Sequence, residues 1–311
     1  MDLHEVYLHP APDEALAMAE HLTQNIPAVA GVLFYGSGLW KEIQEDTVLD
    51  FYLIVDSFSK AKLPISHRIF GTILPPNVYY TELKTDNGTT LRCKYAVMTT
   101  WQFKAAAHGF SIAPSIWARF SQPCRLLYPR SKYDQQDIIN TLHSAVRTFH
   151  RRTLPLLGEF TTVEHLWVTG LQDTYASELR SESKTRGHSI YDANKDYYDQ
   201  ATAAFAAASL ELNELEHQPD PEEFMYHVHV SDNARMVKRI NTPLRHTLGK
   251  MVTFFRLMKA PLTFTGAVDY IVWKIERHTG HKITPTERQR KYPLIFAWPL
   301  VYKVLTKKIA K

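Results

Sequence analysis

Residues Val32-Leu-Phe-Tyr-Gly-Ser-Gly-Leu-Trp40 form an apolar run that breaks at two glycines and a serine. A second apolar run, Asp50-Phe-Tyr-Leu-Ile-Val-Asp56, follows ten residues later. Gly36 and Gly38 have no Cβ, so backbone N–H groups can approach phosphate oxygens closely, and Ser37 adds a hydroxyl donor. Asp50 is an oxygen ligand of the kind that Mg²⁺ takes. This layout predicts a phosphate-binding turn and a metal-binding strand that converge on one triphosphate. An ordinary glycine turn followed by a capped core strand is the alternative.

The composition is that of a globular protein with more than one domain. The chain has 311 residues, 45% hydrophobic and 22% charged, which allows ample core in two or three domains. It contains two cysteines, Cys93 and Cys124, too few for a disulfide framework, and this predicts a reducing compartment. The opening Met-Asp-Leu-His-Glu resembles neither a secretory signal nor a transit peptide. The longest uncharged span, residues 21–40, is too polar to cross a membrane.

Charge is divided unevenly along the chain. Residues 235–311 contain 17 Lys and Arg against 3 Asp and Glu, whereas the preceding 234 residues contain 19 against 29. Trp and Tyr side chains lie among these cations, as is typical of the lipid headgroup layer. The asymmetry predicts an anionic partner for the C-terminal part, either nucleic acid or an acidic membrane surface. A basic helical face that is merely solvated is the alternative.

The pattern of the first 130 residues predicts a mixed sheet with helices. Residues 13–24 have helical spacing with an acidic first turn. Residues 78–83 and 91–98 read as strands that flank Asp86-Asn-Gly88, the strongest hairpin signal in the chain. Together with the strands around the Gly-Ser-Gly turn, these segments predict a first domain over residues 1–130.

A metal site on this sheet has one evident carboxylate, Asp50. The position two residues later is Tyr52, and Asp56 lies roughly 20 Å further along the strand, so one ion cannot bridge Asp50 and Asp56. Glu82 on the neighbouring hairpin is the best remaining carboxylate, although an exposed strand glutamate is an equal alternative. Lys94 lies inside an apolar strand. It neutralises triphosphate charge if it points into the cleft, and it is an ordinary edge lysine if it points out.

Helical periodicity dominates residues 131–234, which we predict to form a second domain. Apolar residues from Ile138 to Phe149 form one stripe, and Thr161-Thr-Val-Glu164 has the pattern of a capping box at the start of the next helix. Glu178 and Arg180 lie near the end of that helix, where they either face the cleft or form a surface ion pair. Residues 211–223 are acidic, contain two prolines and predict a linker ahead of the basic region over residues 235–311.

The histidines do not predict a metal centre. His227 and His229 would share one strand face, but the sequence shows no cysteine or carboxylate that completes a zinc site with them. The serine of the Gly-Ser-Gly turn also lacks the Gly-x-Ser-x-Gly elbow of a serine hydrolase. The sequence therefore favours chemistry on phosphates over zinc or serine hydrolysis.

An ordered set of segments runs through most of the chain. They are Tyr35-Gly-Ser-Gly38, Leu49-Asp-Phe51, Val55-Asp56, Asn77-Val-Tyr-Tyr80, Lys94-Tyr95, Arg119-Phe-Ser-Gln-Pro123, Gly170-Leu171, Glu178-Leu-Arg180 and the segment from Lys259 to Gly266, which contains Leu262-Thr-Phe-Thr-Gly266. This set resembles the mitochondrial-type CDP-diacylglycerol synthases, also called mitochondrial translocator assembly and maintenance proteins, of the nucleotidyltransferase superfamily. The sequence departs from the family at Glu178, where Asp is typical, and at Pro261, which interrupts a Lys-Gly-Ile-like segment.

The resemblance implies an α+β fold with a nucleotidyltransferase-type mixed sheet, a helical or winged-helix domain over the cleft, and a basic C-terminal helical region that contacts a membrane. It implies that CTP and phosphatidate react to CDP-diacylglycerol and pyrophosphate with Mg²⁺. For a bacterial-type member, the expected place is the cytoplasmic inner face of an anionic membrane, with no nucleic-acid partner.

The resemblance also assigns residues. Asp50 would bind the metal, and Glu82, which comes from the carboxylate pattern and not from the resemblance, stays the second candidate ligand. Asp50, Ser37 and Lys94 are the catalytic candidates. Arg180 and Glu178 would lie on the phosphate or lipid side. The residues expected to bind the nucleotide are Gly36, Ser37, Gly38, Lys94 and Arg119.

Two other functions stay open at this point. The same fold could transfer a nucleotide to RNA or to a soluble small molecule, with the basic tail as a nucleic-acid grip. Alternatively, the missing second acid would leave an inactive scaffold that binds lipid. The three functions differ in whether lipid, RNA or nothing is labelled when the protein meets labelled CTP.

Overall fold

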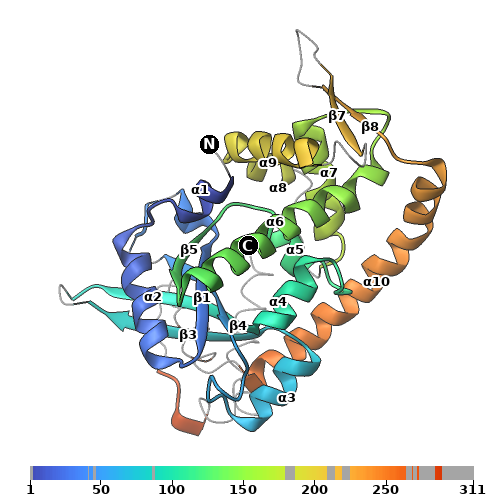
Figure 1. Cartoon of the computed structure of the whole chain (residues 1–311). Helices are drawn as coiled ribbons and strands as arrows, with labels where there is room; N and C mark the ends of the chain where they lie inside the picture. The colour runs from blue at the N-terminus through green and yellow to red at the C-terminus, as the bar shows by residue number, and fades with distance from the viewer. Residues whose placement is uncertain are drawn as a thin grey trace, which may run out of the picture.

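The computed structural model describes residues 3–40, 42–44, 47–85, 88–178, 186–208, 214–218, 225–263, 268, 272 and 284–288. In this part of the chain, a five-stranded mixed sheet lies beside a group of helices, and one long helix runs along the outside (Figure 1). The fold class is α+β, as the sequence predicts.

The sheet has the strand order β3-β4-β2-β1-β5. Its strands are β1 (Val29–Tyr35), β2 (Val48–Val55), β3 (Asn77–Lys84), β4 (Thr90–Thr99) and β5 (Cys124–Pro129). β2 and β4 are parallel, whereas the other neighbouring pairs, including the predicted hairpin of β3 and β4, are antiparallel. The second apolar run begins at Asp50 in the sequence, and the expectation that the strand begins there too is wrong, because Val48 and Leu49 already pair with β4. Asp50 therefore lies inside the sheet.

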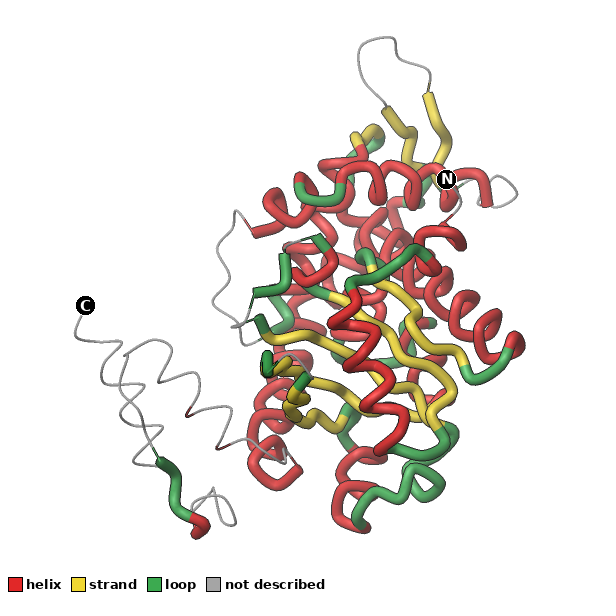
Figure 2. Tube along the Cα trace, turned by 90° about the vertical axis from the view of Figure 1, so that its left-hand side faces the viewer, coloured by secondary structure: helices red, strands yellow, loops and turns green. Residues whose placement is uncertain are grey.

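Different helices cover the two faces of the sheet. On one face, α2 (Asp13–Asn25) packs its buried side against the alternating residues Val32 and Phe34, and it lies across the strands (Figure 2). On the other face, Leu33 and Ile54 pack against helices of a second core. The helices around that second core are α1 (Leu3–Leu8), α4 (Thr100–Ala107), α5 (Ser115–Phe120) and α6 (Lys132–Thr153). A short helix, α3 (Ile65–Ile73), precedes β3.

The second half of the chain adds helices and a small antiparallel sheet of order β6-β8-β7. Its elements are η2 (Leu154–Leu156), β6 (Phe160–Thr162), α7 (Val163–Tyr175), α8 (Arg186–Asp192), α9 (Lys195–Ala208), β7 (Leu215–Gln218) and β8 (Met225–Val228). The prediction of a linker over residues 211–223 is wrong for residues 215–218. These four residues form β7 and pair with β8, and Leu215 is buried.

The start of α7 differs by one residue from the predicted capping box. The hydroxyl of Thr162 caps the helix by accepting a hydrogen bond from the backbone N–H of His165 at 3.1 Å. Thr161 instead belongs to β6, where it pairs with Tyr226. The sequence predicts the helix correctly, but Thr161 pairs in the small sheet, so the capping residue is Thr162.

One hydrophobic core joins the large sheet to the helical half. It contains Leu33 of β1, Phe149 of α6, Trp167 of α7 and Tyr198 of α9. The stripe predicted from Ile138 to Phe149 is buried in this core, as expected. The helical half therefore packs on the sheet face that also carries the candidate site.

The long outer helix is α10 (Asp232–Thr263), which passes from β8 toward α3 (Figure 1). The basic region predicted over residues 235–311 is described up to residue 263 and then at residues 268, 272 and 284–288, and Val268 and Val272 are buried. The rest of that region lies outside the described residues. None of the helices described is both long enough and apolar enough to span a membrane.

Candidate functional site

A row of side chains crosses the large sheet on the face that α4, α5 and α6 cover. The strand register pairs Tyr80 with Lys94, Lys94 with Asp50, Asp50 with Tyr35, and Tyr35 with Cys124. Paired residues of neighbouring strands point to the same side of a sheet. At the centre, Nζ of Lys94 lies 3.5 Å from Oδ1 of Asp50, and the two side chains are 33% and 30% exposed. The row thus presents a carboxylate and a cation to solvent.

The Gly-Ser-Gly turn follows β1 directly and adjoins Asp50. Gly36 has a φ of +89°, where an L side chain would be strained, and a Cβ there would lie 3.3 Å from Oδ2 of Asp50. Ser37 is exposed at the start of the short helix η1 (Ser37–Leu39). A Cβ on Gly38 would lie 2.9 Å from the ring of Phe34, so close packing requires the second glycine. The turn and the candidate metal ligand thus meet.

Arg119 of α5 lies against this row from the helical side. Its guanidinium carbon is 4.7 Å from the centre of the Tyr35 ring, and its charge acts on the buried hydroxyl of Tyr52. Burial alone would lower the pKa of Arg119, but Tyr35, Tyr52, Asp50 and Glu178 together raise it above its usual value. Its buried Nε has no hydrogen-bond partner among the described residues. An anion that accepted from this group would remove the cost of a buried, unsatisfied donor.

A second arginine, Arg256, reaches the same place from α10. Its Nη1 donates to Oγ of Ser115 at 2.8 Å. Burial lowers the pKa of Arg256, and the charge of Arg119 acts in the same direction, while Tyr52 and Glu178 oppose the shift. Sequence reasoning missed Arg256 because it looks like any other cation of the basic region. Only its inward position on α10 distinguishes it.

The structure brings one of the three remaining candidates to the site. These candidates are Glu178, Arg180 and Glu82. Glu178 follows the end of α7, and its charge acts on both Arg119 and Arg256, so it lies at the site. Arg180 lies outside the described residues. The structure does not bring Glu82 to Asp50, because two strand spacings, about 10 Å, separate their strands. Glu82 accepts a hydrogen bond from Tyr80 at 2.7 Å and lies 3.4 Å from Nε of Arg92.

This arrangement can bind a polyphosphate. It combines a glycine turn, one accessible carboxylate and the cations Lys94, Arg119 and Arg256 around one end of the sheet. Such a charge pattern suits a highly anionic ligand that brings its own metal ion. No protein-family model and no curated protein matches this sequence.

Two of those segments contact each other in space. Nζ of Lys259, on α10, donates to the backbone oxygens of Leu74 and Pro76 at 2.6 Å each and to Oδ1 of Asn77 at 3.1 Å. Asn77 opens β3 and is fully buried. These hydrogen bonds of Lys259 attach the end of α10 to the start of β3. They also help to hold Arg256, which lies on the same helix, at the site.

A separate group of possible ligands lies on the small sheet. Glu216 of β7 pairs with His227 of β8, and Oε2 of Glu216 lies 3.3 Å from Nε2 of His229. The ligand atoms of these three residues lie within 4.8 Å of one another. The expectation that the two histidines lack a carboxylate partner is wrong, because the register of β7 and β8 brings Glu216 opposite them.

Proposed function

We propose that this protein is a CTP:phosphatidate cytidylyltransferase that forms CDP-diacylglycerol and pyrophosphate at a membrane surface. The observation that carries the proposal is the meeting of the Gly36 turn, the Asp50 carboxylate and Lys94 on one sheet face, with Arg119 behind them. The ordered segments that resemble mitochondrial-type CDP-diacylglycerol synthases support CTP and phosphatidate as the reactants.

In the proposed reaction, a phosphate oxygen of phosphatidate attacks the α-phosphorus of CTP in line, and the bond to the pyrophosphate oxygen breaks. A phosphate monoester is already ionised at neutral pH, so the reaction needs no general base. Lys94 and Arg119 stabilise the negative charge that develops on the leaving pyrophosphate. The backbone of the Gly36 turn and the hydroxyl of Ser37 orient the phosphates. We assign Glu178 and Arg180 to the side of phosphatidate.

The residues present fit Mg²⁺. This ion is commonly held by one or two carboxylates together with substrate phosphates and water, and Asp50 offers a partly exposed carboxylate beside the turn. Asp50 would hold the ion, which when bound neutralises phosphate charge and aligns the phosphates. A single carboxylate is sufficient here only if the nucleotide supplies further oxygen ligands.

The surface of α10 supports action at a membrane. Ten of its exposed side chains are large and apolar, between 37% and 66% exposed: Met236, Val237, Ile240, Leu244, Leu248, Met251, Phe254, Phe255, Leu257 and Met258. α3, which α10 contacts, adds Ile65, Ile69 and Ile73 at helical spacing. A contiguous apolar surface of this kind, in a region rich in Lys and Arg, suits contact with an anionic bilayer.

The test uses purified protein, labelled CTP, Mg²⁺ and phosphatidate vesicles. Asp50→Asn should lower the formation of labelled CDP-lipid on the order of a thousandfold, because it removes the charge that holds the metal. Asp56→Asn is the matched control, since Asp56 follows the same strand but bonds to Arg130 at 2.9 Å away from the site. Its activity should stay within about threefold of the parent, as for a surface change.

Three results would contradict the proposal. Equal activity of the Asp50→Asn and parent proteins would remove Asp50 from the reaction. Labelling of RNA in place of lipid would favour the nucleic-acid alternative. No turnover with intact vesicle binding would favour a lipid-binding scaffold, the alternative suggested by the separation of Glu82 from Asp50.

A further inference from the structure

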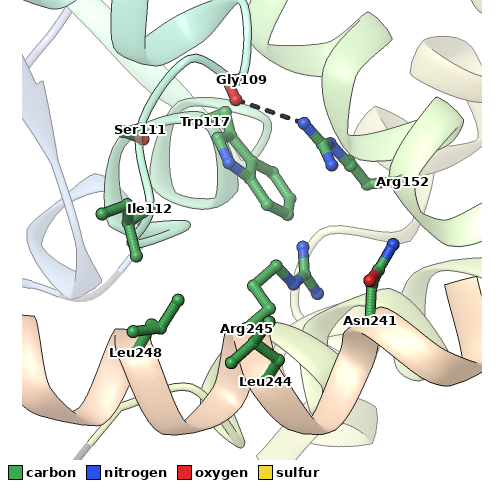
Figure 3. A pocket seen from close by; sticks show the side chains of 9 residues that line it. All are labelled: Gly109, Ser111, Ile112, Trp117, Arg152, Asn241, Leu244, Arg245 and Leu248. Carbon is green, nitrogen blue, oxygen red and sulfur yellow. Dashed lines mark hydrogen bonds between the residues drawn. The ribbon is translucent and has the colours of Figure 1, made fainter.

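A pocket lies between α10 and the helices behind it (Figure 3). It has a volume of about 230 Å³, and its lining comes from the loop after α4, from α5, α6 and α10: Gly109, Ser111, Ile112, Trp117, Arg152, Asn241, Leu244, Arg245 and Leu248. Arg245 precedes Arg256 by eleven residues, about 16 Å of helix. The pocket is therefore a place separate from the candidate active site.

Cations outnumber carboxylates around Arg245, which lines this pocket. Asp173 of α7 is nearly buried and accepts hydrogen bonds from Arg245, from Nζ of Lys238 at 3.1 Å and from Nε2 of His246 at 2.7 Å. Arg152 faces the pocket from α6 and donates to the backbone oxygen of Gly109 at 3.2 Å (Figure 3). Among the described residues, Arg152 has no carboxylate partner. Lys238 and Arg245 thus share one carboxylate and Arg152 adds a third cation, which leaves an excess of positive charge.

The cations repel one another. Burial lowers the pKa of Lys238 to about 8, the charges of Arg245 and Arg152 act in the same direction, and Asp173 opposes the shift. Burial and the charge of Arg245 also lower the pKa of Arg152. The buried Nε of Arg245 lacks a hydrogen-bond partner among the described residues. A bound anion would relieve both the repulsion and the unsatisfied donor.

Apart from Ser111 and Asn241, the side chains of the remaining walls are apolar, and they lead to the surface. Leu244 and Leu248 come from α10, Trp117 lies 5.9 Å from the guanidinium carbon of Arg245, and Ile112 forms part of the opposite wall (Figure 3). Ile112 and its neighbour Phe110 are exposed, as is the outward face of α10. A free phosphate would use the cations but not these walls. A ligand with both an anionic group and hydrocarbon uses both.

We propose that this pocket binds the phosphate group of an anionic membrane phospholipid, which Arg152 and Arg245 hold while the acyl chains follow the apolar face of α10. The bilayer is the source because the pocket opens beside the exposed apolar face of α10, and the charge of the pocket complements an acidic headgroup. This lipid is a second one, distinct from any reacting phosphatidate. The site stands whether or not cytidylyl transfer takes place.

The test uses the full chain without CTP or Mg²⁺, and phosphatidylglycerol, which is not the proposed reactant. Arg152→Gln removes an exposed pocket cation, whereas Arg151→Gln removes its neighbour, which pairs with Glu214 at 3.1 Å outside the pocket. Arg152→Gln should weaken binding to vesicles that contain phosphatidylglycerol about five- to tenfold, and Arg151→Gln should not exceed a twofold change. Equal thermal melting of the two variants shows that both are folded.

Titration with dihexanoyl phosphatidylglycerol, dihexanoyl phosphatidylcholine and inorganic phosphate identifies the ligand. We expect the phosphatidylglycerol to bind more tightly than the other two, and only its binding to depend on Arg152. Equal binding of inorganic phosphate would make the pocket a free-phosphate site and overturn the lipid proposal. Equal binding of the zwitterionic lipid, or equal losses in the Arg152→Gln and Arg151→Gln variants, would overturn it as well.

Discussion

α6 and α10 are long helices that turn opposite faces toward the protein. α6 buries Ile138, Leu142 and Phe149 in the core and exposes polar residues. α10 turns Lys238 and Lys259 inward and exposes an apolar face. Both have the periodicity of an amphipathic helix, so the difference shows that periodicity identifies an apolar face without saying what covers it.

The two helices are also attached by different forces. α6 is held by the burial of hydrocarbon, for example by the stacking of Phe149 on Trp167 at 4.3 Å between ring centres. α10 is held by polar contacts: Arg235 donates to the backbone oxygen of Leu157, and Lys259 donates to three oxygens around Asn77. These polar contacts hold α10 while many of its apolar side chains stay exposed.

The largest effect expected from this comparison is on α6. Phe149→Ala should lower the free energy of unfolding by about 3–5 kcal/mol, because the fully buried ring leaves a cavity beside Trp167 and Gly170. Chemical denaturation measures this change. A loss below about 1 kcal/mol would mean that α6 does not form the main core.

A smaller loss of stability is expected at acid pH, where the buried His150 of α6 must take up a proton when the protein unfolds. Burial lowers the pKa of His150 to about 4, although Nδ1 donates to the backbone oxygen of Val146 at 2.9 Å. Between pH 4 and 6.5 the unfolded chain binds this proton and the folded protein does not. The free energy of unfolding should therefore fall by about 3 kcal/mol as the pH falls through this range.

Denaturation curves at several pH values check this expectation with two variants. His150→Gln should remove most of this pH dependence, whereas His188→Gln, which removes an exposed histidine, should retain it. Equal slopes against pH in the two variants would show that His150 is not the group responsible.

The smallest effect on stability is expected on α10. Phe255→Ala removes a half-exposed ring and should change the free energy of unfolding by no more than about 0.5 kcal/mol, while it weakens vesicle binding about fivefold. Denaturation and vesicle sedimentation measure the two quantities. A destabilisation similar to that of Phe149→Ala would instead show that protein, such as the segment after residue 263, covers this face.

Much of the first half of the fold could be predicted from local signals. The alternation of β3 and β4 around a turn, the stripe of α6 and the Gly-Ser-Gly turn after β1 each come from neighbouring residues. The approach of Gly36 to Asp50 also followed, because a strand, a turn and a second strand leave few arrangements open. β7 was missed because its four residues lie within an acidic segment, where pairing with β8 overrides composition.

The sequence by itself determined the α+β class, the amphipathic character of the helices and the residue types gathered near the Gly36 turn, since these depend on periodicity and on short-range backbone geometry. Only the tertiary structure decided that Arg256 joins Arg119, that Glu82 stays with Arg92, and that α10 exposes its hydrocarbon. These outcomes depend on strand spacing and on contacts between residues more than a hundred positions apart, which local patterns do not encode.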